Sequence, residues 1–271
     1  MTKVSIAFYD YETRTSWSYR GDTFFHAAST IKVPILLGIF ALIEDGVLSL
    51  DSKVHVRNRF LSLIDNVPYR TQSSRDGCPK LYSSLGKTLP VSELAYHMIV
   101  TSSNLATNLL IDLVGVDVLQ EKLKNIGGQG IDLKRGVEDE RAFEEGINNR
   151  VTANGLLGLF RYLHEGDGLT DELSEKMLQI LLAQKFNQGI PIGIPKEIRE
   201  HTLFAHKTGE ISTVAHDSGM IFLPDRKPYS LTILTERTPG KSKSRKAIQA
   251  LSRLVYKSFI NSDTVMVENA S

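Results

Sequence analysis

Alternating apolar and polar residues predict β-strands at both ends of the chain. Residues 3–20 alternate on either side of a polar turn, as expected of an antiparallel hairpin. In the last third, three apolar runs of strand-forming residues predict strands over 203–210, 216–224 and 229–237. An amphipathic pattern over residues 244–260 then predicts a closing helix.

The middle of the chain has the apolar spacing of α-helices instead. Residues 152–166 and 170–184 each open on a threonine and continue with apolar residues three or four positions apart. Residues 90–115 show the same periodicity, interrupted at Thr101–Asn104, which predicts two helices. Residues 133–150 are polar and charged, and we expect a loop or a short exposed helix there.

This order of elements predicts an α/β fold with an added all-α lobe. An antiparallel sheet made from the N- and C-terminal segments would be flanked by helices, and the helical lobe would be inserted between those segments. We expect residues 1–50 and 200–271 to form a discontinuous sheet domain and residues 51–199 a helical domain, with the active site between them.

One helix is expected to be buried on all sides, because residues 33–44 are apolar on nearly every face. Pro34 is tolerated only near the start of such a helix. Ser29 and Lys32 therefore form or immediately precede its first turn, where a three-residue spacing places their side chains on one face. A charged amine at the start of a buried helix is unusual and needs an explanation.

Chemistry supplies one explanation for this lysine. A serine hydroxyl becomes a good nucleophile only when a nearby base takes its proton. A lysine that is desolvated or close to another cation has a lowered pKa and can be that base. The Ser-x-x-Lys spacing recurs at Ser84–Lys87, but there a glycine-containing loop provides no such setting.

Composition narrows the classes of partner. The 271 residues are 41% hydrophobic and 23% charged with a net charge of +1, so neither a nucleic acid nor an anionic membrane is indicated. The longest apolar stretch, Val33–Ile43, is shorter than the roughly 20 residues of a membrane span. A single cysteine, Cys78, excludes an internal disulfide and is interpreted as structural. Because the histidines lack metal-ligand spacing, we expect no metal and no cofactor.

A second candidate motif lies at the interruption between the two middle helices. Ser102 and Asn104 are two residues apart, so a hydroxyl and an amide could face one cleft if the backbone is extended there. The hydroxyl would relay a proton and the amide would hold a substrate carbonyl. The alternative is that these residues only cap the helix that begins near Leu105.

The third motif is Lys207-Thr208-Gly209, which occurs once, on a predicted edge strand. Lys207 provides a positive charge, Thr208 a hydroxyl, and Gly209 room for close approach of a ligand or another backbone. The alternative is an ordinary surface strand that contains a turn glycine.

Together, the three motifs in this order match the pattern of active-site-serine β-lactamases and penicillin-binding proteins. The chain resembles a class A β-lactamase over residues 27–54, 89–115 and 206–235, so the resemblance covers most of the chain. It implies a β-lactamase/transpeptidase-like fold and a β-lactam or peptide-like small-molecule substrate.

The resemblance also implies roles for individual residues. Ser29 would be the nucleophile that becomes acylated, Lys32 its proton acceptor or the group that organises the acceptor, and Ser102 the proton relay to the leaving nitrogen. Substrate would be bound by residues of the other two motifs and by the residue that follows them, namely Asn104, Lys207, Thr208, Gly209 and Glu210. The backbone N–H groups of Ser29 and Glu210 would form the oxyanion hole.

The chain departs from the family at two places. Ser103 occupies the middle of the Ser-x-Asn motif, where the family usually has aspartate, and we expect only a local change in hydrogen bonding. In the family's deacylation loop, Arg-x-Glu-x-x-Leu-Asn, the glutamate activates water. Here Arg135 is present, but Val137 stands in place of the glutamate. Glu138, Asp139 and Glu140 are nearby candidates for the base. The remaining possibility is that none of the three acts as a base.

Three functions follow from these patterns. The first is a serine hydrolase that opens a β-lactam amide through an acyl-serine intermediate. The second is a penicillin-binding D-alanyl peptidase or esterase with slow deacylation. The third is a non-catalytic β-lactam-binding module, against which the intact Ser29, Lys32, Ser102 and Lys207 argue.

The cellular location and the oligomeric state are expectations from weaker signals. The N-terminus enters a strand pattern directly, without a positive segment followed by an apolar one, so we expect a cytoplasmic protein. A secreted or periplasmic protein whose export signal is absent from this sequence would look the same. We expect a monomer.

Overall fold

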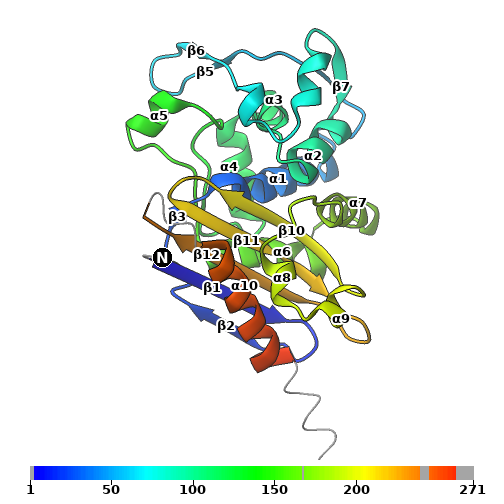
Figure 1. Ribbon diagram of the computed structural model, residues 1–271. Helices are drawn as coiled ribbons and strands as arrows, with labels where there is room; N and C mark the ends of the chain where they lie inside the picture. Colours follow the sequence, from blue (N-terminus) through cyan, green and yellow to red (C-terminus); the bar gives the residue numbers. More distant parts are fainter. Residues whose placement is uncertain (1–2, 167, 239–243, 261–271) are drawn as a thin grey trace, which may run out of the picture.

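A five-stranded antiparallel sheet forms the lower half of the molecule in a computed structural model that describes residues 3–166, 168–238 and 244–260 (Figure 1). The strand order is β10-β11-β12-β1-β2, so the C-terminal strands pair directly with the N-terminal hairpin. The five strands are β1 (Lys3–Asp10), β2 (Ser16–Tyr19), β10 (Leu203–Glu210), β11 (Val214–Phe222) and β12 (Tyr229–Glu236). The predicted hairpin and the three C-terminal strands are confirmed, and β10 lies at an edge of the sheet as expected.

Helices and short strands make up the rest of the described chain. The helices are η1 (Ala28–Ile31), α1 (Lys32–Glu44), η2 (Ser73–Arg75), η3 (Pro79–Ser84), α2 (Val91–Val100), α3 (Asn104–Val114), α4 (Val116–Asn125), α5 (Glu140–Glu144), α6 (Ala153–Glu165), α7 (Asp171–Leu182), α8 (Ile190–Gly193), α9 (Lys196–Arg199), α10 (Ser244–Val255) and the closing turn η4 (Tyr256–Ile260). The short strands are β3 (Phe25–His26), β4 (Lys53–His55), β5 (Phe60–Leu61), β6 (Pro68–Tyr69), β7 (Thr88–Pro90), β8 (Ile131–Asp132) and β9 (Arg150–Val151).

The two faces of the sheet are covered by different helices. Strand side chains alternate between faces, so Ile6 and Phe8 of β1 point to one side, where they share a core with Ile248 of α10. Ala7 points to the other side and belongs to the main core, to which Phe160 of α6 also contributes. In Figure 1, α10 lies in front of the sheet and α6 behind it.

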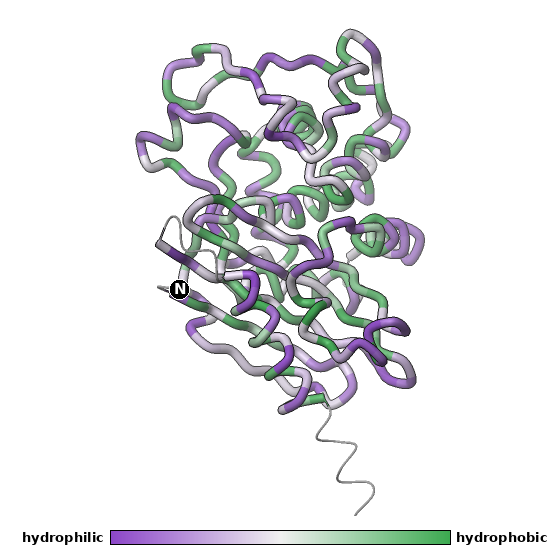
Figure 2. Tube along the Cα trace, in the orientation of Figure 1, coloured by the Kyte–Doolittle hydropathy of each residue, from purple (hydrophilic) through white to green (hydrophobic). Residues whose placement is uncertain are grey.

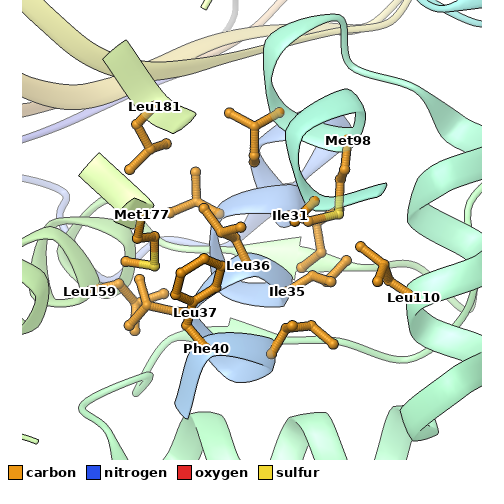
Figure 3. Close-up of a cluster of buried hydrophobic side chains, with 14 of the residues drawn as sticks. Ile31, Ile35, Leu36, Leu37, Phe40, Met98, Leu110, Leu159, Met177 and Leu181 are labelled. Atoms are coloured by element: carbon orange, nitrogen blue, oxygen red, sulfur yellow. The ribbon is translucent and has the colours of Figure 1, made fainter. Parts of the chain in front are cut away.

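Helix α1 lies at the centre of the main core. Every residue from Lys32 to Leu42 is buried, as the apolar pattern predicts. In Figure 3, Met177 of α7 lies beside Phe40, and Met98 of α2 lies beside Ile31, just before α1. Figure 2 shows the same division along the chain, with apolar segments inside and polar segments in the surface loops. The helix therefore connects the sheet to the upper helical lobe.

The expected division into domains stays a prediction. The upper part of Figure 1 holds α2, α3, α5 and the short strands β5, β6 and β7, in line with a helical lobe. However, α6 comes from the middle segment and packs against β1 and β12 of the sheet. Among the described helices, none has both the length and the apolar character needed to cross a membrane.

Truncation of the central helix tests how much α1 contributes to the fold. Leu36 is 0% exposed, so Leu36→Ala removes buried methyl groups and leaves a cavity, and we expect the free energy of unfolding to fall by about 2–5 kcal/mol. Denaturant unfolding followed by circular dichroism measures this change. Val47→Ala, at a residue 66% exposed, is the control and should change stability by less than about 0.5 kcal/mol. Equal effects of the two substitutions would contradict a central role for α1.

Candidate active site

A cleft of about 860 Å³ brings together segments from both halves of the chain. The sequence-predicted residues on its wall are Ser29, Ser102, Asn104, Thr208, Gly209 and Glu210. Lys32 and Lys207 are fully buried next to these residues. The structure therefore brings all eight predicted site residues to one place.

The amine of Lys32 is the centre of this arrangement. Its Nζ atom lies 3.2 Å from Ser29 Oγ, 3.0 Å from Ser102 Oγ, and 2.8 Å from both Ser102 O and Asn104 Oδ1. Lys32 is the first residue of α1, and Ser29 lies one turn earlier in η1. The local helical spacing therefore sets the Ser29–Lys32 distance, whereas Ser102 and Asn104 reach the amine from a distant segment.

Burial changes the charge of this amine. Removal from water lowers the pKa of Lys32 to about 7, while the negative charges of Asp76 and Glu138 oppose that effect. The lowered pKa makes the neutral form of Lys32 accessible near neutral pH, and a neutral amine can accept a proton. The apolar helix that begins at this residue supplies the desolvation, which accounts for a lysine at such a position.

The turn between α2 and α3 points Ser102 and Asn104 into the cleft. Ser102 has φ +58°, a left-handed conformation that is unfavourable for serine. Ser103, rather than either neighbour, caps α3 by accepting the N–H of Ala106 at 3.2 Å. The capping alternative therefore applies only to Ser103, and both of its neighbours are free to contact Lys32.

Strand β10 passes very close to the turn that holds Ser29. A Cβ atom on Gly209 would lie 2.9 Å from the backbone nitrogen of Thr30 and 3.0 Å from that of Ser29. Only glycine allows this approach, as the sequence analysis expected of this position. Consequently the backbones of β10 and η1 lie side by side at the cleft, as two donors of an oxyanion hole must.

The second lysine is equally buried. Lys207 donates to the carbonyl oxygen of Thr208 at 2.8 Å. Burial lowers the pKa of Lys207 well below its usual value, repulsion by Lys32 lowers it further, and Asp217 acts in the opposite direction. An anion bound at this point would gain from an amine that has little other charge compensation.

The side chain of Glu210 is engaged by two arginines. Its carboxylate accepts from Arg237 Nη2 at 2.9 Å and from Arg245 Nε at 2.7 Å. These ion pairs offset the negative charge beside Lys207. The carboxylate of Glu210 is thus already bound by two arginines.

Of the three acidic candidates in the loop, only Glu138 is connected to the lysine. Glu138 Oε1 accepts from Asn104 Nδ2 at 2.6 Å, and the Oδ1 atom of the same amide accepts from Lys32. The other oxygen, Oε2, accepts the N–H of Gln72 at 3.0 Å. A single amide therefore links the carboxylate to the amine.

The other two acids have structural partners. Asp139 is 2% exposed, accepts from Ser62 Oγ at 2.9 Å and caps α5. Glu140 forms an exposed ion pair with Arg75 at 2.8 Å. Neither has the connection to Lys32 that Glu138 has.

The backbone explains why the glutamate is one position later than the family motif. The N–H and C=O groups of Val137 are both bound by the side-chain amide of Asn108, at 2.7 and 2.9 Å. This contact fixes Val137 against α3 and leaves Glu138, with φ +59°, on the cleft wall. Pattern matching of the motif alone misses such a shift.

Polar contacts join the two ends of the loop, residues 134–135 and 147–149, and the sequence analysis did not identify them. Arg135 donates to Ile147 O at 2.7 Å and to Asn148 Oδ1 at 3.0 Å. Asn149 Oδ1 accepts the N–H groups of Lys134 and Arg135. The two consecutive asparagines, Asn148 and Asn149, were the feature of the sequence that could have indicated these contacts. Asp76, a buried acid beside the Ser102 turn, was also missed, and no local pattern marks it.

We find no candidate metal site in the part of the chain that the structure describes. No group of three or more histidine, cysteine, aspartate or glutamate side chains there could hold a metal ion. The arrangement provides three hydroxyls, two amines, an amide and the Glu138 carboxylate around one cleft. Such a set is suited to nucleophilic attack on a carbonyl with proton transfer.

The close approach of β10 gives a direct test of the geometry. Gly209→Ala would force the strand away from the Ser29 turn, and we expect a loss of about 1–3 kcal/mol in stability because both neighbours are backbone atoms. Denaturant unfolding and a crystal structure of the variant measure the loss and the shift. Gly158→Ala, whose Cβ would lie 3.3 Å from Gly127 O, is the matched control and should cost less. An unmoved strand in Gly209→Ala would show that the approach is less tight.

Comparison with known proteins agrees with this geometry. The model of the Beta-lactamase enzyme family matches residues 1–259. A β-lactamase of Rhodobacter capsulatus is 27% identical over 258 residues, which are 93% of this chain and 82% of that protein. PBP-A superposes with a TM-score of 0.79 at 25% identity, covering 95% of this chain and 89% of that one. An ancestral class A β-lactamase superposes with a TM-score of 0.77 at 25% identity, covering 95% and 94%. The chain therefore belongs to the β-lactamase enzyme family and has the fold shared by class A β-lactamases and PBP-A.

Proposed function

We propose that this protein is a serine hydrolase of the class A type, which opens β-lactam amides through an acyl-serine intermediate. The observation that carries the proposal is the position of Lys32 Nζ, within 3.2 Å of Ser29 Oγ and Ser102 Oγ. Burial gives this amine a pKa of about 7, which matches the needs of a base at neutral pH. The family and the fold support the same function.

Acylation would use the cleft residues as follows. Neutral Lys32 takes the hydroxyl proton of Ser29 as Oγ attacks the carbonyl carbon of the lactam. The oxyanion that develops lies between the backbone N–H groups of Ser29 and Glu210, and loss of one such donor typically costs about 2.7–4 kcal/mol. When the C–N bond breaks, Ser102 passes a proton from Lys32 to the nitrogen, which leaves an ester on Ser29.

Substrate binding would involve the charged and polar groups on either side. The buried ammonium of Lys207 and the hydroxyl of Thr208 would hold a carboxylate, which compensates the charge of the lysine. Asn104 Nδ2 donates one N–H to Glu138, and we assign its second N–H to a carbonyl oxygen of the substrate.

Deacylation would require a base for water, and we assign Glu138 to that role. Its carboxylate takes a proton from a water molecule, whose oxygen attacks the acyl carbon. The C–O bond to Ser29 breaks, and the proton that Glu138 took from water is returned to Oγ, so the serine hydroxyl and the carboxylate are both restored. Each carboxylate oxygen has two lone pairs, so the hydrogen bonds from Asn104 and Gln72 leave room to accept one from water.

A second function is supported by one feature of the loop. The acidic residue does not occupy the register of the family motif, and Val137 stands in that register. PBP-A, of similar fold, has a variant whose structure is an acyl-enzyme complex with penicillin G. A penicillin-binding peptidase or esterase with slow deacylation is therefore the alternative.

Turnover and covalent trapping separate these functions. We expect sustained hydrolysis of a chromogenic cephalosporin and an adduct on Ser29 that mass spectrometry detects at short times. Ser29→Ala should show neither, because the attacking oxygen is gone. A single burst with a stable adduct would favour the penicillin-binding alternative. No adduct from a folded sample would contradict both, and an adduct on Ser29→Ala would identify a different nucleophile.

The role of Glu138 has its own test. Glu138→Gln keeps the size of the side chain but removes the base, so we expect the acyl-enzyme to form and its hydrolysis to slow by about 10²–10⁴-fold. The adduct should then accumulate in time-resolved mass spectra. Glu145→Gln, an exposed acid of the same loop, is the matched control and should hydrolyse the adduct at the wild-type rate. Unchanged turnover in Glu138→Gln would assign the base elsewhere.

A further inference from the structure

Asp76 is a buried carboxylate that belongs to none of the three motifs. It lies between η2 and η3 and is 6% exposed. Its Oδ2 atom accepts the backbone N–H groups of Asn104 and Leu105 at 2.8 and 2.9 Å, and the hydroxyl of Ser103 at 3.2 Å. One oxygen therefore holds three successive residues at the start of α3.

The chain on both sides of Asp76 is fixed against the same turn. Its Oδ1 atom accepts the N–H of Cys78 at 2.7 Å, which folds the segment back on itself. Between these residues, Gly77 packs so closely that an added Cβ would lie 1.6 Å from Thr101 O. Residues 76–78, which we call the brace, thus press against the turn that contains Ser102.

The brace explains how an unfavourable turn persists. A left-handed serine costs on the order of 1–3 kcal/mol and survives only where the surroundings hold it in place. Ser102 has this conformation, and it places both Oγ and the carbonyl oxygen on Lys32 Nζ. The hydrogen bonds from Ser103 and Asn104 to Asp76 hold the two residues that follow.

Asp76 also acts through its charge. A carboxylate at a helix N-terminus is favourable, because the free N–H groups there carry partial positive charge. The charges of Asp76 and Glu138 favour the protonated form of Lys32, and repulsion between Lys32 and Lys207 opposes it. Of the two carboxylates, Asp76 raises the pKa of Lys32 more than Glu138 does.

We propose that Asp76 is a positioning residue for the acylation machinery, holding Ser102 and Asn104 around the Lys32 amine and supplying the negative charge beneath them. Ser103 stands where class A enzymes usually have an aspartate, and Asp76 supplies a carboxylate at the start of α3 that the motif itself lacks. The inference rests on the proposed function, since it assigns a residue to the acylation step.

Two substitutions separate the charge from the geometry. Asp76→Asn removes the charge and keeps an acceptor oxygen, so the pKa of Lys32 should fall and the acidic limb of the acylation rate should move to lower pH. In Asp76→Ser the side chain is too short to accept the hydrogen bonds from Ser103, Asn104 and Leu105. We therefore expect Ser102 to be misplaced and acylation to slow by about 100-fold.

A relocated carboxylate gives the decisive comparison. In Asp76→Ser combined with Ser103→Asp, the charge returns to the start of α3 on residue 103 itself, so most of the lost acylation rate should be recovered. Asp10→Asn is the matched control, because Asp10 is a carboxylate 1% exposed that binds Arg226, away from the cleft. It should leave the acidic limb where it is in the wild type.

The measurements are the pH profile of adduct formation with penicillin and the NMR titration of ¹³Cε-labelled lysine, with the Lys32 signal assigned from Lys32→Arg. A downward shift of both midpoints in Asp76→Asn, with rescue in the double variant, supports the proposal. Unchanged midpoints, or a folded double variant no faster than Asp76→Ser, would overturn it. If the wild type forms no adduct, the proposed function fails, and the titration of Lys32 alone still decides the role of Asp76.

Discussion

The site depends on the burial of one amine. Lys32 starts an apolar helix whose following residues are packed on every side, and water cannot solvate its charge there. Four oxygens, from Ser29, Ser102 and Asn104, replace that water. An ammonium has only three N–H groups for these four oxygens, and a neutral amine has two N–H groups and a lone pair that can accept the hydroxyl proton of Ser29.

The fold follows from the need to bring those oxygens together. Ser29 lies in η1 and Lys32 at the start of α1, Ser102 and Asn104 lie where α2 is followed by α3, and β10 reaches the cleft from the C-terminal part of the chain. The contact between Gly209 and the backbone of Ser29 joins the sheet to α1, while Asp76 joins the helical lobe to the same centre. Each contact is between segments far apart in sequence, so the complete site exists only in the folded chain.

The sequence was sufficient where function follows from local spacing. Ser29 and Lys32 are one turn apart, and the apolar run over residues 33–44 showed where the helix that follows lies. Strand alternation likewise predicted the hairpin, and the expected edge position of the strand that carries Lys207 is confirmed. Sequence patterns could not show features that depend on tertiary contacts. One such contact is the hydrogen bond from Val137 to Asn108, which fixes Val137 and leaves Glu138 on the cleft wall. Asp76 binds residues 103–105, which lie far from it in the sequence, and hydrophobic periodicity gives no sign of such a contact.

The two buried lysines place opposite demands on one cleft. The proposed acylation needs Lys32 neutral, whereas binding of a carboxylate needs Lys207 charged. Burial lowers the pKa of both, and their mutual repulsion disfavours the state with two charges. When Lys32 loses its proton, Lys207 keeps its own more easily. In the proposed mechanism, a substrate carboxylate favours the charged form of Lys207. The amine left to take the proton of Ser29 is that of Lys32, which lies beside the nucleophile.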